Sequence, residues 1–363
     1  MIHRYQKKGL NFVLDVNSGA VHLLDDISYA VSGLLDENMG DTCPQSIIDA
    51  LPDYTADEIR EAYDELYELK KAGQLFAQDD YIDVSRYIPV NAPVKALCLH
   101  VAHDCNLRCQ YCFASTGDFG QGRKIMPPEI AKKAIDFVIA RSGVRHNIEV
   151  DFFGGEPLMA WDTVTQTVDY ARSLEEKHNK KFRFTITTNG LLLDEDKRKY
   201  INENMDNCVL SLDGRREVND EFRKTVAGTG SYDTIVPKFK ALVDERDPNL
   251  DYYARGTFTS HNLDFAEDVL SIADAGFDRL SVEPVTADPG CGYDLTEDDL
   301  PKIEAGYDRL SDIMLERKQE GKPFTFFDFM VDLDQGPCVV KRLRGCGAGY
   351  EYVAVTPDGD IYP

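Results

Sequence analysis

The sequence predicts an α/β protein in which a small N-terminal domain precedes a larger domain of alternating strands and helices. Three observations support this class. Residues 1–80 show a hairpin pattern followed by helical patterns, whereas residues 94–320 repeat strand and helix six times. The chain has 363 residues, of which 43% are hydrophobic, so it is long and apolar enough to bury a substantial core.

The first eighty residues contain the predicted hairpin. The segments LNFVLDV and AVHLL have strand patterns and flank a turn at 17–19. Helical patterns follow at 27–35, 45–50 and 56–71. The last begins after Thr55, and Glu58 three residues later completes a capping box. Strands followed by three short helices resemble a winged-helix unit, and residues 81–93, polar and proline-containing, are predicted to be a linker.

The larger domain is predicted to be a partial (β/α)6 barrel. Its strand candidates span 96–102, 148–153, 182–187, 208–212, 252–259 and 279–283. Helical patterns lie at 128–141, 162–176, 195–204, 232–244, 265–275 and 297–319. This alternation implies parallel strands joined by crossover helices. In such barrels ligands bind at the C-terminal ends of the strands.

Charge and hydropathy exclude several functions. The formal net charge of −24 opposes binding to a nucleic-acid backbone, which needs a surplus of Lys and Arg. The chain has no apolar run of membrane-spanning length, and its N-terminus, MIHRYQKKGL, lacks an apolar signal core. We therefore expect a cytoplasmic protein with neither a membrane nor a nucleic-acid partner.

Three of the nine cysteines, Cys105, Cys109 and Cys112, form a C-x3-C-x2-C pattern directly after the first predicted barrel strand. Thiolates grouped on one loop select iron–sulfur clusters or zinc. Zinc would require a fourth ligand, such as His100 or His103, although structural zinc usually uses two separated cysteine pairs. On a four-iron cluster, three cysteines leave one iron without a protein ligand. Four other cysteines stand alone and are assigned to the core or surface: Cys43, Cys98, Cys208 and Cys291.

Further polar residues follow the next three predicted strands. Adjacent glycines allow close backbone approach to a ligand, and a carboxylate can bind an ammonium group. Each motif also has a structural interpretation, as a turn with a solvated acid or a conformational asparagine. The candidates are Gly154, Gly155 and Glu156 after the second strand, Thr188 and Asn189 after the third, and Ser211 and Asp213 after the fourth.

The last two predicted barrel strands contribute charged residues. Arg255 is a charge inside an apolar strand, so we expect it to be buried with a carboxylate partner, either on a ligand or in a structural salt bridge. Glu283, followed by Pro284 and Val285, ends the sixth strand and is expected to shape the ligand pocket.

The cysteine loop, with Tyr111 and Phe113 beside Cys112, resembles the signature of the radical S-adenosylmethionine (SAM) superfamily. The resemblance implies a [4Fe-4S] cluster whose open iron chelates the amino and carboxylate groups of SAM. Electron transfer then cleaves SAM into methionine and a 5′-deoxyadenosyl radical. It also implies SAM contacts from Tyr111, the Gly154-Gly155-Glu156 motif, Asn189, Ser211, Asp213 and Arg255. Glu283 is placed near the adenine.

The C-terminal residues resemble the start of the SPASM motif, in which a cysteine, a spacer and a glycine precede a second cysteine. Cys346 and Gly359 match this pattern, and the chain ends where the next cysteine would follow. We therefore expect residues 321–363 to be the start of a truncated SPASM domain. The resemblance implies one or two auxiliary [4Fe-4S] clusters, with Cys346 and Cys338 as candidate ligands.

Residues 1–80 are expected to bind a peptide by strand addition, because the acidic helix 56–71 would repel nucleic acid. The strings GLNFVLDVNSGAVHLLDD and HDCNLRCQYCFA resemble maturases of six-cysteine (SCIFF) peptides. The resemblance implies binding of a cysteine-rich precursor peptide through its leader segment. It also implies a thioether between a cysteine sulfur and an acceptor Cα. The electron source would be a reductant such as flavodoxin or ferredoxin.

Several alternatives remain open at this stage. Other SPASM reactions are oxidation of Cys or Ser in a sulfatase and carbon–carbon crosslinking of a peptide. A third alternative is a non-catalytic peptide-binding protein that keeps a cluster for structure. The sequence identifies no catalytic base. Asp328, Asp332 and Asp334 either face the pocket or form a solvated acidic face.

Overall fold

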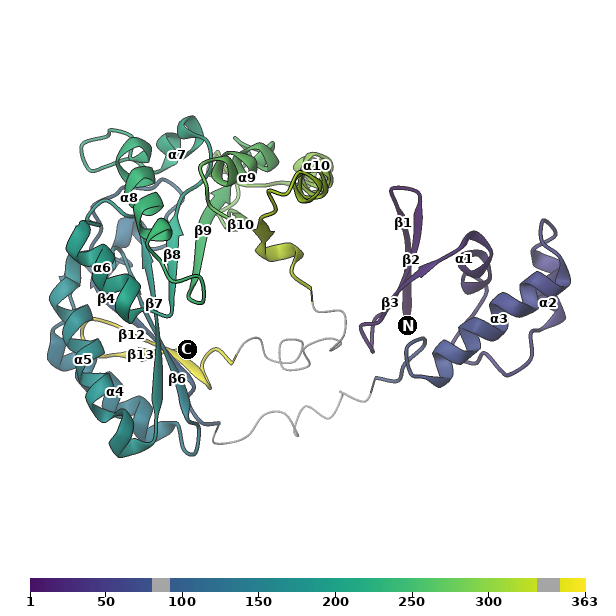
Figure 1. Cartoon of the computed structure of the whole chain (residues 1–363), viewed down its shortest axis with the longest axis horizontal. Coiled ribbons are helices and arrows are strands. Elements are labelled where there is room, and N and C mark those ends of the chain that lie inside the picture. The colour runs from purple at the N-terminus through teal and green to yellow at the C-terminus, as the bar shows by residue number, and fades with distance from the viewer. Residues whose placement is uncertain (80–91, 332–346) are drawn as a thin grey trace. The chain divides into compact units, whose positions relative to one another are not determined.

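The computed structural model describes residues 1–79, 92–331 and 347–363. Two compact units divide these residues, and each is described by itself (Figure 1). The first unit contains the N-terminal residues up to 79. The second contains residues 92–330 together with 347–363.

The first unit combines an antiparallel three-stranded sheet with three helices. Its strands, in sheet order, are β1 (Ile2–Lys7), β2 (Leu10–Asp15) and β3 (Val21–Leu24). Its helices are α1 (Asp26–Ser32), α2 (Gln45–Ala50) and α3 (Ala56–Lys71). The predicted hairpin and helices are confirmed, as is the capping box, in which Thr55 Oγ1 accepts from the Glu58 N–H and the Glu58 carboxylate accepts from the Thr55 N–H. The sequence analysis missed β1 because its mostly exposed residues carry no clear apolar alternation.

The second unit contains all six predicted barrel strands, side by side and parallel. They are β4 (Ala96–His103), β6 (Asn147–Gly154), β7 (Lys181–Thr188), β8 (Asn207–Ser211), β9 (Asp251–Phe258) and β10 (Arg279–Pro284). Chain order and sheet order agree along this series. The carboxyl ends of neighbouring strands therefore lie together at one edge of the sheet.

Four short strands extend this sheet. β5 (Lys124–Ile125) pairs with β4, and β11 (Thr325–Phe326) lies beside β10. On the other side of β4 lies β12 (Tyr352–Val355), parallel to it, followed by β13 (Ile361–Tyr362). Residues 352–355 thus pack as a further strand of the main sheet, although the sequence analysis placed them in a separate C-terminal region. The boundaries of that region stay a prediction.

The predicted crossover helices are all present. They are α4 (Pro128–Arg141), α5 (Trp161–His178), α6 (Glu195–Asn204), α8 (Tyr232–Asp244), α9 (Phe265–Asp274) and α10 (Leu300–Gln319). Among the α-helices of the described residues, α7 (Arg216–Phe222), which lies between β8 and α8, was not predicted. None of the helices in the described ranges combines the length and the apolar character that crossing a membrane requires.

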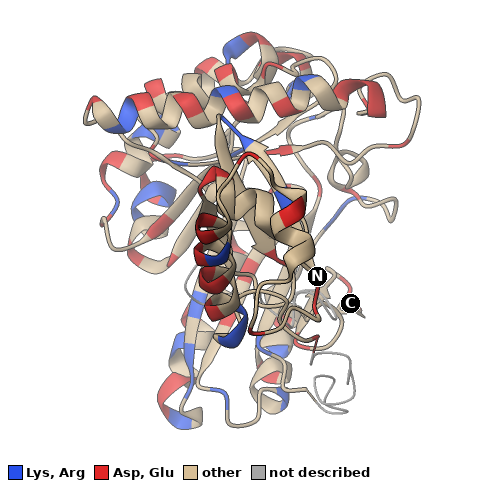
Figure 2. Cartoon of the chain, turned by 90° about the vertical axis from the view of Figure 1, so that its right-hand side faces the viewer, with Lys and Arg blue, Asp and Glu red and all other residues tan. Residues whose placement is uncertain are grey.

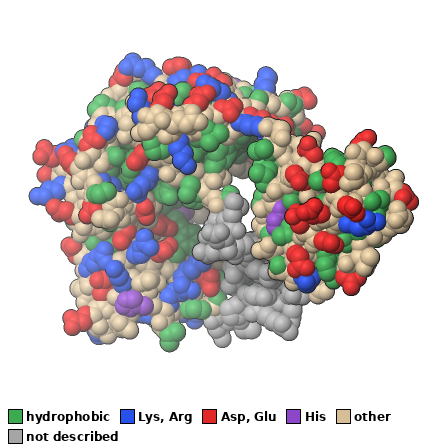
Figure 3. Space-filling view, turned by 45° about the vertical axis from the view of Figure 1, so that its right-hand side comes forward, with side chains coloured by type: hydrophobic (Ala, Val, Ile, Leu, Met, Phe, Trp, Pro, Cys, Tyr) green, Lys and Arg blue, Asp and Glu red, His purple; other side chains and the backbone are tan. Residues whose placement is uncertain are grey.

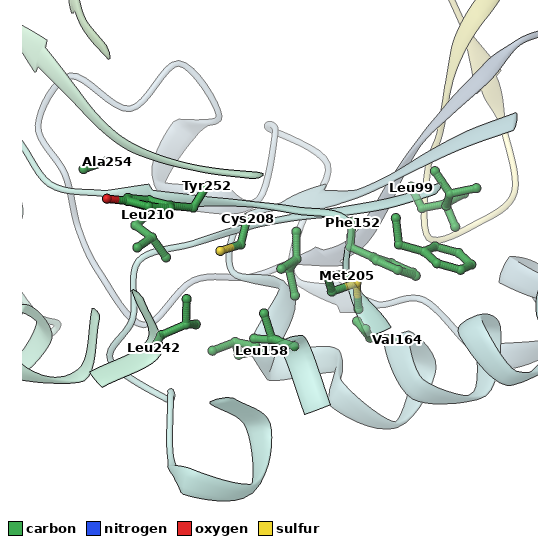
Figure 4. Packing of buried hydrophobic residues seen from close by; sticks show 14 of the residues in the cluster. Leu99, Phe152, Leu158, Val164, Met205, Cys208, Leu210, Leu242, Tyr252 and Ala254 are labelled. Carbon is green, nitrogen blue, oxygen red and sulfur yellow. The ribbon is translucent and has the colours of Figure 1, made fainter. Parts of the chain in front are cut away.

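The core of the second unit lies between the sheet and these helices. Figure 4 shows Phe152 of β6 near Met205 and Val164, with Leu210 of β8 further along the same layer. All four side chains are at most 1% exposed. Phe152 also stacks on Phe184 of the neighbouring strand, with ring centroids 5.8 Å apart. This packing fixes the strands whose ends carry the candidate site.

We expect Phe152→Ala to lower the free energy of unfolding by about 3–5 kcal/mol, because the substitution leaves a cavity in a closely packed core. Urea unfolding followed by circular dichroism measures the change. Val144→Ala is the control, since Val144 is fully exposed and its loss should change stability by less than about 0.5 kcal/mol. Equal effects of the two substitutions would contradict this assignment of the core.

Candidate functional site

A cavity of about 530 Å³ opens where the barrel strands end. Figure 3 shows hydrophobic side chains gathered in the hollow of the larger unit. The cavity brings together nearly all the predicted site residues, from the cysteine loop and from the ends of five neighbouring strands. They are Cys105, Cys109, Tyr111, Cys112, Gly154, Gly155, Glu156, Thr188, Asn189, Ser211, Arg255, Glu283, Pro284 and Val285.

The loop that carries the three cysteines contains neither helix nor strand and is held by a neighbouring segment. Residues 222–225, at the end of α7, run alongside it. Leu107 forms an isolated antiparallel bridge with Thr225. The Arg108 N–H donates to the Lys224 carbonyl at 2.7 Å, and the Gln110 N–H donates to the Phe222 carbonyl at 3.2 Å. The segment at the end of the unpredicted helix α7 therefore holds the cysteine loop in place through backbone hydrogen bonds.

The three cysteines of the loop are partly buried. Burial, followed by the nearby Glu156 charge, raises the pKa of Cys105 to about 12. Burial also raises the pKa of Cys109 to about 11. Cys105 Sγ accepts contacts from the Leu107 N–H at 3.4 Å and from Asn189 Nδ2 at 3.5 Å. Metal ligation requires the thiolate form, so metal binding must supply the free energy of deprotonation, and the two N–H groups favour the charged sulfur.

Gly154 and Gly155 allow the end of β6 to approach the start of the cysteine loop. A Cβ on Gly155 would lie closer than 3.0 Å to the carbonyl oxygen of Asp104, and one on Gly154 would meet the carbonyl oxygen of Ala102. Gly154 also has a φ of +123°, which disfavours other residues. The predicted close approach is thus present between two backbone segments of the site, one of which carries the cysteines.

Glu156 is fully buried and ties β6 to the end of β7. Its Oε1 accepts from Thr188 Oγ1 at 2.7 Å and from the Leu158 N–H at 3.0 Å. Its Oε2 accepts from the Asn189 N–H at 2.8 Å. Burial raises the pKa of Glu156 to about 6, and the three hydrogen bonds oppose that rise. The carboxylate therefore orients the 188–189 turn, which places Asn189 against Cys105.

Asp213 lies behind the cavity rather than among its lining residues. It is fully buried, and its carboxylate is surrounded by protein donors. Tyr111 Oη donates to Oδ2, while Oδ1 accepts from the Thr257 N–H at 3.1 Å and lies 3.0 Å from Arg223 Nε. The expected contact with a ligand stays a prediction, and the structure adds a link from Asp213 to the cysteine loop.

Arg255 corrects one expectation, because it is not buried. Its side chain is 51% exposed and forms an ion pair with Glu283 at the end of the adjacent strand. Of the two partners considered, the described structure contains the salt bridge. The error arose because a polar residue at the mouth of a cavity and a buried charge look alike in an apolar strand sequence.

The sequence analysis missed Arg223 and Thr257, which both line the cavity. Thr257 lies two residues after Arg255 on β9, so the alternation of the strand could have identified it. Arg223 carries no comparable signal. It follows a short helix that was not predicted, and only the folded chain brings it beside Tyr111.

The proposed zinc ligands are not assembled around the cysteines. His100 Nδ1 lies 3.4 Å from His103 Nε2, and both rings stack on Phe119. Burial, followed by the His103 charge, lowers the pKa of His100 to about 4. Within the described ranges, no three His, Cys, Asp or Glu side chains converge on a point that could hold one metal ion.

The remaining candidates lie elsewhere. Cys98 and Cys208 are buried, Cys43 is partly buried and Cys291 is exposed, in agreement with their assignment to core and surface. Asp328 is exposed. Cys338, Cys346, Asp332 and Asp334 lie outside the described residues.

Comparison with known proteins gives the same class of domain. Residues 99–253 match the model of the Radical SAM superfamily. This segment is therefore a radical SAM domain, which implies a [4Fe-4S] cluster and SAM as cofactors. The fit is supported by the donor set, because three cysteine thiols line one cavity of about 530 Å³.

Two of the relatives to which this chain is similar are a cyclopropyl synthase and a sulfatase-maturating enzyme. The radical SAM cyclopropyl synthase TigE of Paramaledivibacter caminithermalis is 28% identical over 197 residues, 50% of this chain and 40% of TigE. A cysteine-type anaerobic sulfatase-maturating enzyme of Clostridium novyi is 29% identical over 147 residues, 38% of this chain and 37% of that enzyme. The aligned part thus covers less than half of each relative.

Two solved structures share the fold. The structure of anSMEcpe with bound AdoMet aligns with a TM-score of 0.61 at 22% identity, over 75% of this chain and 74% of that one. Streptococcus suis SuiB bound to S-adenosylmethionine aligns with a TM-score of 0.53 at 17% identity, over 100% of this chain and 81% of SuiB. The predicted α/β fold with a parallel radical SAM sheet is confirmed.

We expect Gly155→Ala to reduce iron loading at least twofold, because the added methyl group must push the cysteine loop away from the end of β6. Iron and sulfide analysis after anaerobic reconstitution measures the loading. Gly40→Ala is the control, since nothing lies within 4 Å of the added atom and Gly40 has no positive φ. Full loading of the Gly155 variant would contradict the close approach described here.

Proposed function

We propose that this chain is a radical SAM enzyme that joins a cysteine sulfur to the Cα of an acceptor residue in a ribosomally made, cysteine-rich precursor peptide. The observation that supports this most directly is the shared cavity of the three cysteines and the polar strand ends. The cluster and SAM supply a 5′-deoxyadenosyl radical when bound. The acceptor Cα loses a hydrogen atom, the thiol loses a proton, and one electron leaves to an oxidant, here an auxiliary iron–sulfur cluster with Cys338 and Cys346 as proposed ligands.

The residues of the cavity have distinct proposed roles. Cys105, Cys109 and Cys112 bind the cluster, and Asn189 supports Cys105 through its 3.5 Å contact. Ser211 offers a hydroxyl to SAM from the cavity wall. The exposed Arg255–Glu283 pair also lines the cavity. Either charge can therefore exchange its partner for a charged group of SAM or of the peptide.

The N-terminal unit is proposed to capture the leader of the peptide. β1 and β3 are the outer strands of its sheet in the described residues, so each has one side that faces no other strand. β3 also presents Val21 and Leu23, which are 38% and 61% exposed. An added peptide strand would satisfy the backbone and cover these side chains. Figure 2 shows acidic residues in red on the N-terminal unit, and α3 contains six of them, which supports a peptide rather than a nucleic acid as the partner.

A second candidate function is another SPASM-type modification of a protein or peptide. The similarity to a sulfatase-maturating enzyme favours this alternative over a non-catalytic role. The peptide-capture unit favours the thioether reaction, because oxidation of a sulfatase residue does not call for a leader-binding sheet. We also propose a cytoplasmic setting and a flavodoxin or ferredoxin as the electron donor.

Replacement of Cys105, Cys109 and Cys112 by Ala should abolish cleavage of SAM, because the cluster then has no ligands. The measurement is 5′-deoxyadenosine formed by the anaerobically reconstituted chain with dithionite. Cys291→Ala is a matched control on an exposed, isolated cysteine and should retain activity within twofold of the unmodified chain. Cleavage by the triple variant would show that the radical originates elsewhere, and no cleavage by a fully loaded chain would favour the non-catalytic alternative.

A peptide deuterated at the acceptor Cα should transfer that deuterium to 5′-deoxyadenosine, so that the peptide loses one deuterium and one hydrogen when the thioether forms. The substrate is a synthetic six-cysteine peptide with its leader, taken from the reading frame beside the gene. Mass spectrometry of both products measures the transfer. SAM cleavage without deuterium transfer would refute abstraction at this carbon while leaving the radical SAM assignment intact.

A further inference from the structure

Arg223 is a buried cation beside the cysteine loop. It caps the C-terminal end of α7, is 9% exposed and lines the cavity. Its Nε lies 3.0 Å from Asp213 Oδ1, yet it is one of two buried side-chain polar atoms in the described ranges without a well-formed hydrogen bond. A buried charge is costly unless it is paired, and the Asp213 carboxylate is the partner in the described structure.

The backbone around Arg223 is already committed to the cysteine loop. The carbonyls on either side of it, those of Phe222 and Lys224, accept the hydrogen bonds from Gln110 and Arg108. The Arg223 carbonyl itself accepts from Ser231 Oγ at 2.7 Å, and its N–H donates to the Asn219 carbonyl at 2.8 Å. Because these hydrogen bonds fix the main chain at Arg223 and at both neighbours, the fold determines where the Arg223 side chain starts.

The guanidinium and Asp213 together enclose Tyr111, which lies between Cys109 and Cys112. Arg223 Cζ lies 5.6 Å from the centre of the Tyr111 ring, and Tyr111 Oη donates to Asp213 Oδ2. The three side chains form one connected group of cation, carboxylate and phenol. This group contacts the cysteine loop through Tyr111, whereas Asn189 contacts it through Cys105.

The two members of the pair lie differently with respect to the cavity. Arg223 lines it together with Cys109, whereas Asp213 is not among the lining residues. The cation is therefore the member of the pair on the side of the cysteines. Arginine keeps its charge at every accessible pH, so its positive field there is permanent.

We propose that Arg223, oriented by Asp213, is a positioning residue that holds a fixed positive charge against the Cys109 side of the iron–sulfur cluster and makes the cluster easier to reduce. Reduction adds one negative charge, which a nearby cation stabilises, and burial strengthens the interaction. The inference rests on cluster binding by the three cysteines and is independent of the peptide that the enzyme modifies.

The test is the reduction potential of this cluster in the full chain without SAM, measured by redox titration followed by electron paramagnetic resonance. The signal used is the one that disappears in Cys105→Ala. Arg223→Gln should lower the equilibrium constant for one-electron reduction about tenfold, equivalent to 59 mV. Asp213→Asn should raise it, because the opposing carboxylate charge is removed. The double variant should lie between Arg223→Gln and the unmodified chain.

Two further variants separate charge from structure. Arg223→Lys keeps the cation and should change the equilibrium constant by less than threefold. Arg216→Gln, on the same helix, removes an exposed cation paired with Asp233 and should leave the potential unchanged. If the two residues had a purely structural role, Arg223→Gln and Asp213→Asn would shift the reduction potential of the cluster in the same direction. The electrostatic role predicts shifts in opposite directions.

Equal potentials in Arg223→Gln and the unmodified chain would overturn the proposal, even if SAM binding were weakened. If Arg223→Gln assembles no cluster, Asp213→Asn and Arg223→Lys decide the matter. A raised potential in the first and a nearly unchanged potential in the second support the proposal. An unchanged or lowered potential in Asp213→Asn refutes it.

Discussion

The candidate site depends on how a loop without helix or strand is held in place. Residues 104–112 carry the three cysteines, yet their only regular pairing is the single bridge at Leu107. Several attachments set their position from outside, and three of them come from the main sheet and α7: the end of β6 packs against Asp104, Asn189 contacts Cys105, and residues 222–225 accept backbone hydrogen bonds from the loop. Each of these three attachments comes from a different βα repeat, so the geometry of the thiols depends on the register of the whole sheet.

Two buried carboxylates make these attachments rigid. Glu156 connects the ends of β6 and β7, and Asp213 connects the end of β8 to Tyr111 and Arg223. In an α/β sheet, strand ends are natural sites for ligands. In this chain, residues at the strand ends, such as Glu156 and Asp213, also hold the cysteine loop and its neighbours in position. A carboxylate at a strand end is therefore a poor guide, by itself, to which atoms touch the cofactor.

The sequence was sufficient to predict the repeating part of the fold, since apolar strands and amphipathic helices have a strong periodic signal. It located β4 and β6 to β10, and it failed for β1 and α7, where the pattern is short or polar. For the site, spacing identified the cysteines and the glycine pair because their chemistry is local in sequence. The burial of Arg255 was predicted wrongly, and Arg223 was missed. Exposure and partner choice depend on neighbours far along the chain, which spacing does not reveal.

The buried pair of Asp213 and Arg223 is difficult to explain by stability alone. Removing two charges from water costs several kcal/mol, and replacing such pairs by apolar residues is often neutral or stabilising. In the described structure the two charges are joined by the 3.0 Å contact between Arg223 Nε and Asp213 Oδ1, and Arg223 also lines the cavity. A cation on the cavity side of the pair becomes more favourable when a negatively charged cluster occupies the cavity. The proposed electrostatic role at the cluster therefore accounts for a buried pair that stability alone does not require.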